Sequence, residues 1–338
     1  MKPQLADFGP IGADLRQLEL KVRAIASQAL AQGRAAVVIG HRDAWSGWQA
    51  VPHFARTPAD AAQLVVGPAC GAGLAKYLLD ELPGLTPGTP AVVVARGCDL
   101  MGVRRLVADH RVDADLVRVL AIPCVGRFDA RKVAAATGTD LSRSPGAFLA
   151  AACLACRSRW PEDIAATDGQ AVGLDLTAMR RLLPGTSANP ARGQDAFAAQ
   201  DEIAAIGALS PAARMAYWSQ WFARCIRCYA CRSVCPACHC EVCVLDSLAP
   251  AWLPRSADLP HQFMFQFIRG MDVAGRCVGC GQCENACPAG IPLAQLWAKT
   301  AADVGELFGV ANPFLPGADE PLGVFDPRDP EPTAPGRR

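Results

Sequence analysis

The 338-residue sequence has almost no net charge and no long hydrophobic segment. Its 33 basic and 32 acidic side chains leave a formal charge of +1, which provides no field to hold a polyanion. The longest uninterrupted apolar run, Ala147–Cys156, has ten residues, about half of the roughly twenty that span a bilayer. These absences argue against a general nucleic-acid binder and predict no transmembrane helix.

The first twenty residues include acidic side chains and lack the apolar segment of a secretory signal peptide, so we expect a cytoplasmic protein. With 51% hydrophobic residues, the chain can bury a core, and its length suits two domains and a tail. In a reducing compartment, closely spaced cysteines are more often metal ligands or redox centres than disulfides. The sixteen cysteines are therefore the leading clue to function.

The cysteines are unevenly distributed, because eleven of the sixteen lie between Cys225 and Cys287. Residues 1–200 instead alternate helical patterns with β-branched runs at 35–39, 63–66 and 91–95. Such alternation predicts an α/β domain with a mainly parallel sheet. Helical patterns are expected at residues 15–31, 73–82, 100–110, 194–206, 211–224, 260–273 and 293–307.

A bacterial ferredoxin motif, C-x2-C-x2-C-x3-C-P, occurs twice, at 225–236 and at 277–288. Three thiolates at this spacing can surround one 4Fe-4S cluster, while the fourth, followed by proline, reaches the other cluster. Glycines between the ligands leave backbone N–H groups free to point at sulfur. The motif predicts crossed ligation, in which one cluster is held by Cys225, Cys228, Cys231 and Cys287 and the other by Cys277, Cys280, Cys283 and Cys235.

Two zinc ribbons are the alternative for these eight cysteines, but structural zinc sites do not need a third C-x2 step or a terminal Cys-Pro. The 41 residues between Cys235 and Cys277 contain a helical pattern. This arrangement resembles the α-helical ferredoxin domains of succinate dehydrogenase and heterodisulfide reductase iron–sulfur subunits. We therefore expect an α/β domain at 1–200, an α-helical ferredoxin domain with two 4Fe-4S clusters at 201–308, and a Pro-rich tail at 309–338.

A second group of thiols, Cys238-His239-Cys240-x2-Cys243, lies between the two runs. These residues can ligate a zinc ion, contribute to another cluster, act as an internal redox shield, or simply be buried thiols. The sequence leaves these alternatives open, and it also assigns no role to Cys70.

Several stretches of the chain resemble the beta subunits of coenzyme F-420-type hydrogenases and dehydrogenases, including formate dehydrogenase beta subunits. The resemblance covers roughly residues 33–300 and includes the Cys-Pro-x-Cys-x-Cys that follows the first run. The other matching stretches are residues 35–40 (AAVVIG), 67–78 (GPACGAGLAKYL), 95–100 (ARGCDL), 121–126 (AIPCVG) and 153–156 (CLAC).

In that family a Pro-Cys turn and a C-x2-C pair contribute to a further 4Fe-4S cluster beside a flavin. Carried over, the resemblance implicates Cys124, Cys153 and Cys156 in a third cluster, with Cys98 preferred to Cys70 as the fourth ligand. It also raises FAD as a cofactor, although no flavin contacts are legible in the sequence. The alternative is that these cysteines are small buried hydrophobic residues.

The paired motif, without any catalytic constellation, predicts an iron–sulfur electron-transfer subunit of an oxidoreductase complex. Its partners would be other redox subunits, such as a flavoprotein, a hydrogenase, a formate dehydrogenase or a heterodisulfide-reductase-like module. The alternative is a flavin-containing subunit that exchanges hydride with a deazaflavin or nicotinamide cofactor and feeds electrons to its own clusters.

Overall fold

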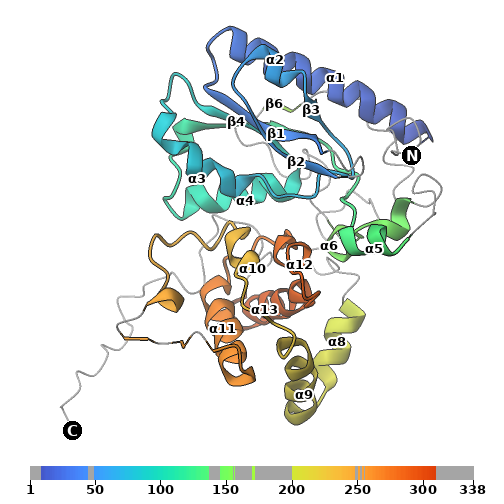
Figure 1. Ribbon diagram of the computed structural model, residues 1–338, viewed down its shortest axis with the longest axis vertical. Helices are drawn as coiled ribbons and strands as arrows, with labels where there is room; N and C mark the ends of the chain where they lie inside the picture. Colours follow the sequence, from blue (N-terminus) through green and yellow to red (C-terminus); the bar gives the residue numbers. More distant parts are fainter. Residues whose placement is uncertain are drawn as a thin grey trace.

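The computed structural model describes residues 9–44, 49–136, 145–154, 156, 170–171, 200–247, 250–251, 253–254 and 256–309. These residues form an α/β part (9–171) and a helical part (200–309), which lie against each other (Figure 1). Within the described ranges, no helix has the length and apolarity needed to cross a membrane. Nearly all of the Pro-rich tail expected at 309–338 lies outside these ranges.

The α/β part is built on a six-stranded sheet with the order β2-β1-β4-β5-β6, and β3 pairs with His41 and Arg42 of β1, beyond the residues that pair with β4. The strands are β1 Val37–Asp43, β2 Ala50–Ala55, β3 Leu64–Val65, β4 Ala91–Ala95, β5 Val117–Ala121 and β6 Gln170–Ala171. Strands β1, β4, β5 and β6 run parallel, whereas β2 and β3 are antiparallel to β1. The sheet is therefore mixed. Only six residues separate β1 from β2, which is too short for a parallel crossover.

The helices of this part are α1 Gly9–Ala31, α2 Pro58–Ala61, α3 Leu78–Glu81, α4 Gly97–Ala108, α5 Ala130–Ala135 and α6 Ala151–Leu154. The helix expected at 73–82 is shorter, since a 3-10 turn at Ala75–Tyr77 precedes α3. The backbone N–H of Leu74 donates to the Asp99 carboxylate at 2.7 Å. This bond joins the residue before the 3-10 turn to α4. The α-helix that follows the turn, α3, has four residues.

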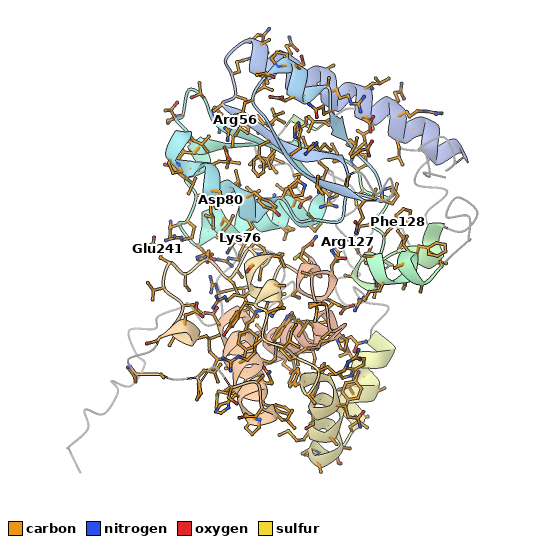
Figure 2. All side chains as sticks on the ribbon, viewed as in Figure 1. Arg56, Lys76, Asp80, Arg127, Phe128 and Glu241 are labelled. Carbon is orange, nitrogen blue, oxygen red and sulfur yellow. The ribbon has the colours of Figure 1, made fainter. Side chains whose placement is uncertain are left out.

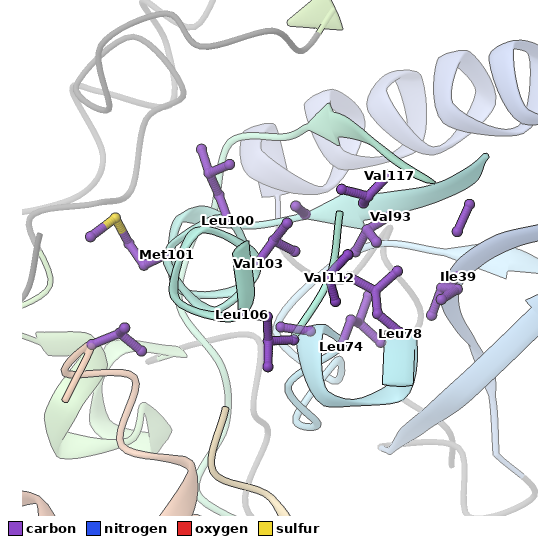
Figure 3. Packing of buried hydrophobic residues seen from close by; sticks show 14 of the residues in the cluster. Ile39, Leu74, Leu78, Val93, Leu100, Met101, Val103, Leu106, Val112 and Val117 are labelled. Atoms are coloured by element: carbon purple, nitrogen blue, oxygen red, sulfur yellow. The ribbon is translucent and has the colours of Figure 1, made fainter. Parts of the chain in front are cut away.

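Aliphatic side chains form the core of the α/β part. On one face of the sheet, Leu15, Leu18 and Val22 of α1 pack with the side chains of β1 and β4. On the other face, α3 and α4 enclose a second cluster that includes Ile39 and Leu106 (Figure 3). Val278 of the helical part is buried in this second cluster, so the two parts share a hydrophobic contact.

The helical part consists of α8 Gln200–Ala208, α9 Pro211–Phe222, α10 Ala230–Ser233, α11 Leu259–Val273, α12 Gln282–Asn285 and α13 Leu293–Phe308. Asp258 caps α11 by accepting the N–H of His261, and Ser210 caps α9 with Pro211 in its first turn. The core contains aromatic side chains together with the buried thiols of Cys231 and Cys283. Cysteine is therefore a core residue here, unlike in the aliphatic clusters of the sheet.

Candidate metal centres

The two cysteine runs have the same backbone conformation. In the first run, Arg227 and Tyr229 have φ angles of 50° and 60°, and in the second run Gly279 and Gly281 both have 64°. Each left-handed pair stands at the same positions between the first three cysteines, and each run continues into a one-turn helix, α10 or α12. The sequence repeat is thus a structural repeat, maintained in the first run without glycine.

The same backbone donates to sulfur in both runs. The N–H of Arg227 lies 3.4 Å from Cys225 Sγ, and the N–H of Gly279 lies 3.5 Å from Cys277 Sγ. The donor at position 279 was anticipated from its glycine, whereas the donor at 227 was not. Amide groups directed at ligand sulfurs are a recurrent feature of iron–sulfur sites.

A small cavity lies beside the second run. Its walls include Cys235 together with Cys277, Cys280 and Cys283. Cys235 belongs to the first run, so the fold brings together four thiols that lie up to 48 positions apart in sequence. This is the grouping that crossed ligation requires.

The walls of this cavity also carry hydrogen-bond donors without acceptors. Arg269 is 2% exposed, and its Nε and Nη1 have no partner among the described residues; the same holds for Nε1 of Trp297, which is 4% exposed. Buried donors normally find acceptors, and a sulfur-rich anionic group in the cavity would supply them. The donor set therefore fits a 4Fe-4S cluster. Within the described residues, no His, Cys, Asp and Glu side chains are grouped closely enough to hold a single metal ion.

Burial changes the acid–base behaviour of these thiols. It raises the pKa of Cys277 to about 12 and the pKa of Cys280 to about 11. A hydrogen bond from the Cys238 thiol instead lowers the pKa of Cys235 below its ordinary value. Because metals bind thiolates, loading this cavity with iron must displace protons from Cys277 and Cys280.

The other predicted set, Cys225, Cys228, Cys231 and Cys287, is also brought together. Burial raises the pKa of Cys231, and the nearby Cys225, Cys287 and Cys228 raise it further. Cys231 is buried and Cys228 is exposed, so this set reaches from the core to the surface.

The third predicted set is assembled from separate elements of the α/β part. Cys98 lies in the first turn of α4, Cys124 follows β5, Cys153 lies on α6, and Cys156 follows it. Burial raises the pKa of Cys98 well above its ordinary value, and the charges of Cys124 and Cys156 contribute to that rise. The N–H of Gly126 lies 3.3 Å from Cys124 Sγ, and the N–H of Arg127 lies 3.4 Å from Cys153 Sγ.

Arg127 joins the third set to the second. It is 3% exposed, and its guanidinium donates to the carbonyls of Cys280 and Gly281, both at 2.9 Å. Figure 2 shows Arg127 between the two parts of the molecule. At Gly281 a Cβ would lie 2.5 Å from the Cβ of Ala152, so α6 and the second run meet at a position that only glycine permits. Sequence reasoning missed Arg127 and Arg269, since neither lies in a motif.

The Cys238-His239-Cys240-x2-Cys243 segment, whose role the sequence left open, includes a histidine that contacts charged residues. His239 Nε2 lies 2.7 Å from Asp109 Oδ2, and the same oxygen accepts from Arg276 Nη2 at 2.7 Å. Burial raises the pKa of Asp109, but hydrogen bonds from His239, Arg276 and Arg105 outweigh it and hold that pKa well below its ordinary value. Asp109 therefore binds the imidazole of His239 and fastens the end of α4 to both cysteine runs.

A larger cleft of about 1010 Å³ lies between the two parts. The α/β part contributes Gly71–Gly73, Lys76 and Asp80, and the helical part contributes Cys238, Cys240, Glu241 and Cys243. Lys76 donates to the carbonyl of Cys238 across the cleft. Figure 2 shows Lys76 on the side of the α/β part that faces the helical part. The cleft is large enough for an organic cofactor.

Known proteins similar to this chain are redox subunits. Over 106 residues the chain is 36% identical to "F420-dependent formate dehydrogenase subunit beta" of Methanocaldococcus jannaschii, covering 31% of this chain and 26% of the relative. It is also 36% identical over 103 residues to "F420-dependent formate dehydrogenase 1 subunit beta" of Methanococcus maripaludis, covering 30% of this chain and 25% of that relative. The chain is homologous to these beta subunits over the matched segment.

This homology confirms the resemblance inferred from the cysteine motifs and the stretches around them. The match spans about a quarter of the length of each formate dehydrogenase beta subunit. No family model matches the chain.

Proposed function

We propose that this chain is an iron–sulfur electron-transfer subunit of an oxidoreductase complex, with an α-helical ferredoxin domain in its helical part. The observation that carries the proposal is the cavity lined by Cys235, Cys277, Cys280 and Cys283, with orphan donors on Arg269 and Trp297. Bound 4Fe-4S clusters would supply one-electron transfer. The residues of the chain hold, insulate and space the clusters.

The contacts support a linear order for the three sets. Cys98 of the third set and Cys280 of the second line the same small cavity. Arg269, on the wall of the second cavity, donates to the carbonyl of Cys231 in the first set at 2.9 Å. The second set therefore stands between the other two, and electrons would cross the chain from the sheet to the surface near Cys228.

The partners follow from the relatives and from the surface. The relatives are named as beta subunits, which implies other subunits in their complexes. Near the first set, Cys228 is exposed and the neighbouring Ile226 side chain is 66% exposed. We infer a redox subunit there, of the hydrogenase, formate dehydrogenase or heterodisulfide-reductase-like kind.

The cleft between the two parts favours a second candidate function. Gly73 lines both this cleft and the cavity that Cys98 shares with Cys280, so a flavin in the cleft would adjoin the thiols of two sets. The half-buried Lys76 would hold a phosphate or a reduced, anionic ring there. In this alternative the chain is a flavoprotein that exchanges hydride with a deazaflavin or nicotinamide cofactor.

Anaerobic purification with quantification of iron, acid-labile sulfide and flavin tests both functions. Three filled sets predict about twelve irons per chain, and the two ferredoxin-type sets alone predict about eight. Colourless protein without iron would reject the electron-transfer proposal. A stoichiometric flavin would establish the second candidate function, and protein with intact clusters but no flavin would remove it.

A further inference from the structure

Arg269 is a buried cation located between two of the cysteine sets. It lies on α11, outside both cysteine runs, and is 2% exposed. Its guanidinium stacks over the ring of Trp297, 5.2 Å from the centroid. Gly270 makes this arrangement possible, because a Cβ there would lie 2.9 Å from Trp297 Cζ3. The position of the arginine is thus fixed by the packing of α11 against α13.

The groups around Arg269 are thiols and a carbonyl. Nη2 donates to the Cys231 carbonyl at 2.9 Å, while Nε and Nη1 have no partner in the described chain. A guanidinium stays protonated in proteins, and the groups near this one include the thiols of Cys231, Cys283, Cys235 and Cys238. The side chain is therefore a buried cation among thiols.

A buried cation without an anion is strongly destabilising. A thiolate-ligated 4Fe-4S cluster is an anion, and it gains a further negative charge on reduction. Arg269 lines the cavity of Cys235, Cys277, Cys280 and Cys283 and also touches Cys231 of the other set. One positive charge is therefore positioned to act on two centres.

Resting on the proposed electron-transfer function, we propose that Arg269 is a shared cation that raises the reduction potentials of both ferredoxin-type clusters. It stabilises the reduced form of each centre by charge and donates hydrogen bonds to sulfur from Nε and Nη1. Trp297 Nε1 adds one neutral donor to the second centre alone.

The test is an EPR-monitored redox titration of the full chain with its clusters. The Arg269→Gln variant should shift both midpoint potentials in the negative direction, each by at least a tenfold change in the reduction equilibrium, about 59 mV for one electron. The Arg269→Lys variant keeps the charge and should shift them less. Arg224→Gln is the matched control, because Arg224 is an exposed arginine next to Cys225, and it should leave both potentials unchanged.

Unchanged potentials in Arg269→Gln protein with full iron would overturn the proposal, and a shift of one centre alone would overturn the shared role. Should both Arg269 variants fail to retain iron, Trp297→Phe serves instead. It should lower the reduction potential of the second centre and leave that of the first unchanged. A second-centre potential equal to that of the wild-type protein would reject the donor assignment. Wild-type protein without iron would reject the proposed electron-transfer function itself, before any variant is compared.

Discussion

The α/β part and the helical part bury different material. The sheet and its helices enclose aliphatic clusters in which side chains such as Leu18, Ile39 and Leu106 are fully buried. The helical part encloses Cys231 and Cys283 among aromatic side chains, with six further cysteines packed against them. Its two cysteine runs form only single-turn helices, α10 and α12.

The two kinds of core should differ in the source of their stability. An aliphatic core is stable by itself, since burying each methylene stabilises the fold by about 0.8 kcal/mol. A core of thiols around a cavity gains its stability when a metal cluster joins the thiols, so binding and folding are coupled. The α/β part should therefore fold without iron, and the helical part should need it.

Removing iron is the strongest test of this contrast. Anaerobic chelation should increase hydrogen exchange greatly in α10, α12 and the adjoining loops, because their cysteines lose their common ligand. Exchange in β1, β4 and β5 should remain slow, because the sheet keeps its hydrocarbon core. Mass spectrometry of the exchanged peptides measures both. Equal gains in the two parts would show that the α/β part depends on the clusters as much as the helical part does.

The next test concerns crossed ligation within the helical part. Cys287→Ser should reduce iron by about four per chain and remove the signal of the centre held by Cys225, Cys228 and Cys231. The reason is that Cys287 lies with that set although it is the last cysteine of the second run. Cys240→Ser, an exposed thiol outside both sets, is the control and should retain all iron. Loss confined to the Cys277 centre would contradict the crossed arrangement.

A smaller effect is expected in the α/β part. The double variant Cys153→Ser/Cys156→Ser should also lower iron by about four per chain, but both ferredoxin-type centres and the sheet should remain. Iron analysis and EPR spectra of the variant measure this. Cys70→Ala is the comparison, because Cys70 is a buried thiol that hydrogen bonds to the Val65 carbonyl. It was the alternative to Cys98 as fourth ligand, so full iron in this variant is expected if Cys98 is the ligand. Full iron in the double variant would return both cysteines to the role of packing residues.

Much of the helical part was predictable, because its ligands are close in sequence and its spacing is specific. The helices expected at 260–273 and 293–307 are observed as α11 and α13, each within one residue at either end. The α/β part was less accessible. The β-branched runs at 35–39 and 91–95 predicted β1 and β4, but β2 contains Pro52 and His53 and gave no apolar run.

The residues that were missed make long-range contacts. Arg127 reaches carbonyls 153 and 154 positions away, and Arg269 reaches one 38 positions away. Because most arginines in proteins are exposed, an arginine outside a motif is expected on the surface until the fold shows what surrounds it. The His239 imidazole was considered as a ligand because of its cysteine neighbours, whereas its contact with Asp109 depends on α4, 130 positions earlier.

Gly281 lies where the α/β part contacts the second cysteine run. Under the proposed function, this contact also lies between the third and second cysteine sets. Ala152 and the Arg127 guanidinium meet the second run at this one backbone position. Any movement that parts the sheet from the helices would open the gap between the third and second cysteine sets. Since electron tunnelling weakens steeply with distance, such a movement would slow electron transfer between clusters in these two sets. Under the proposed function, the packing between the two parts would therefore also set the distance for electron transfer between the third and second sets.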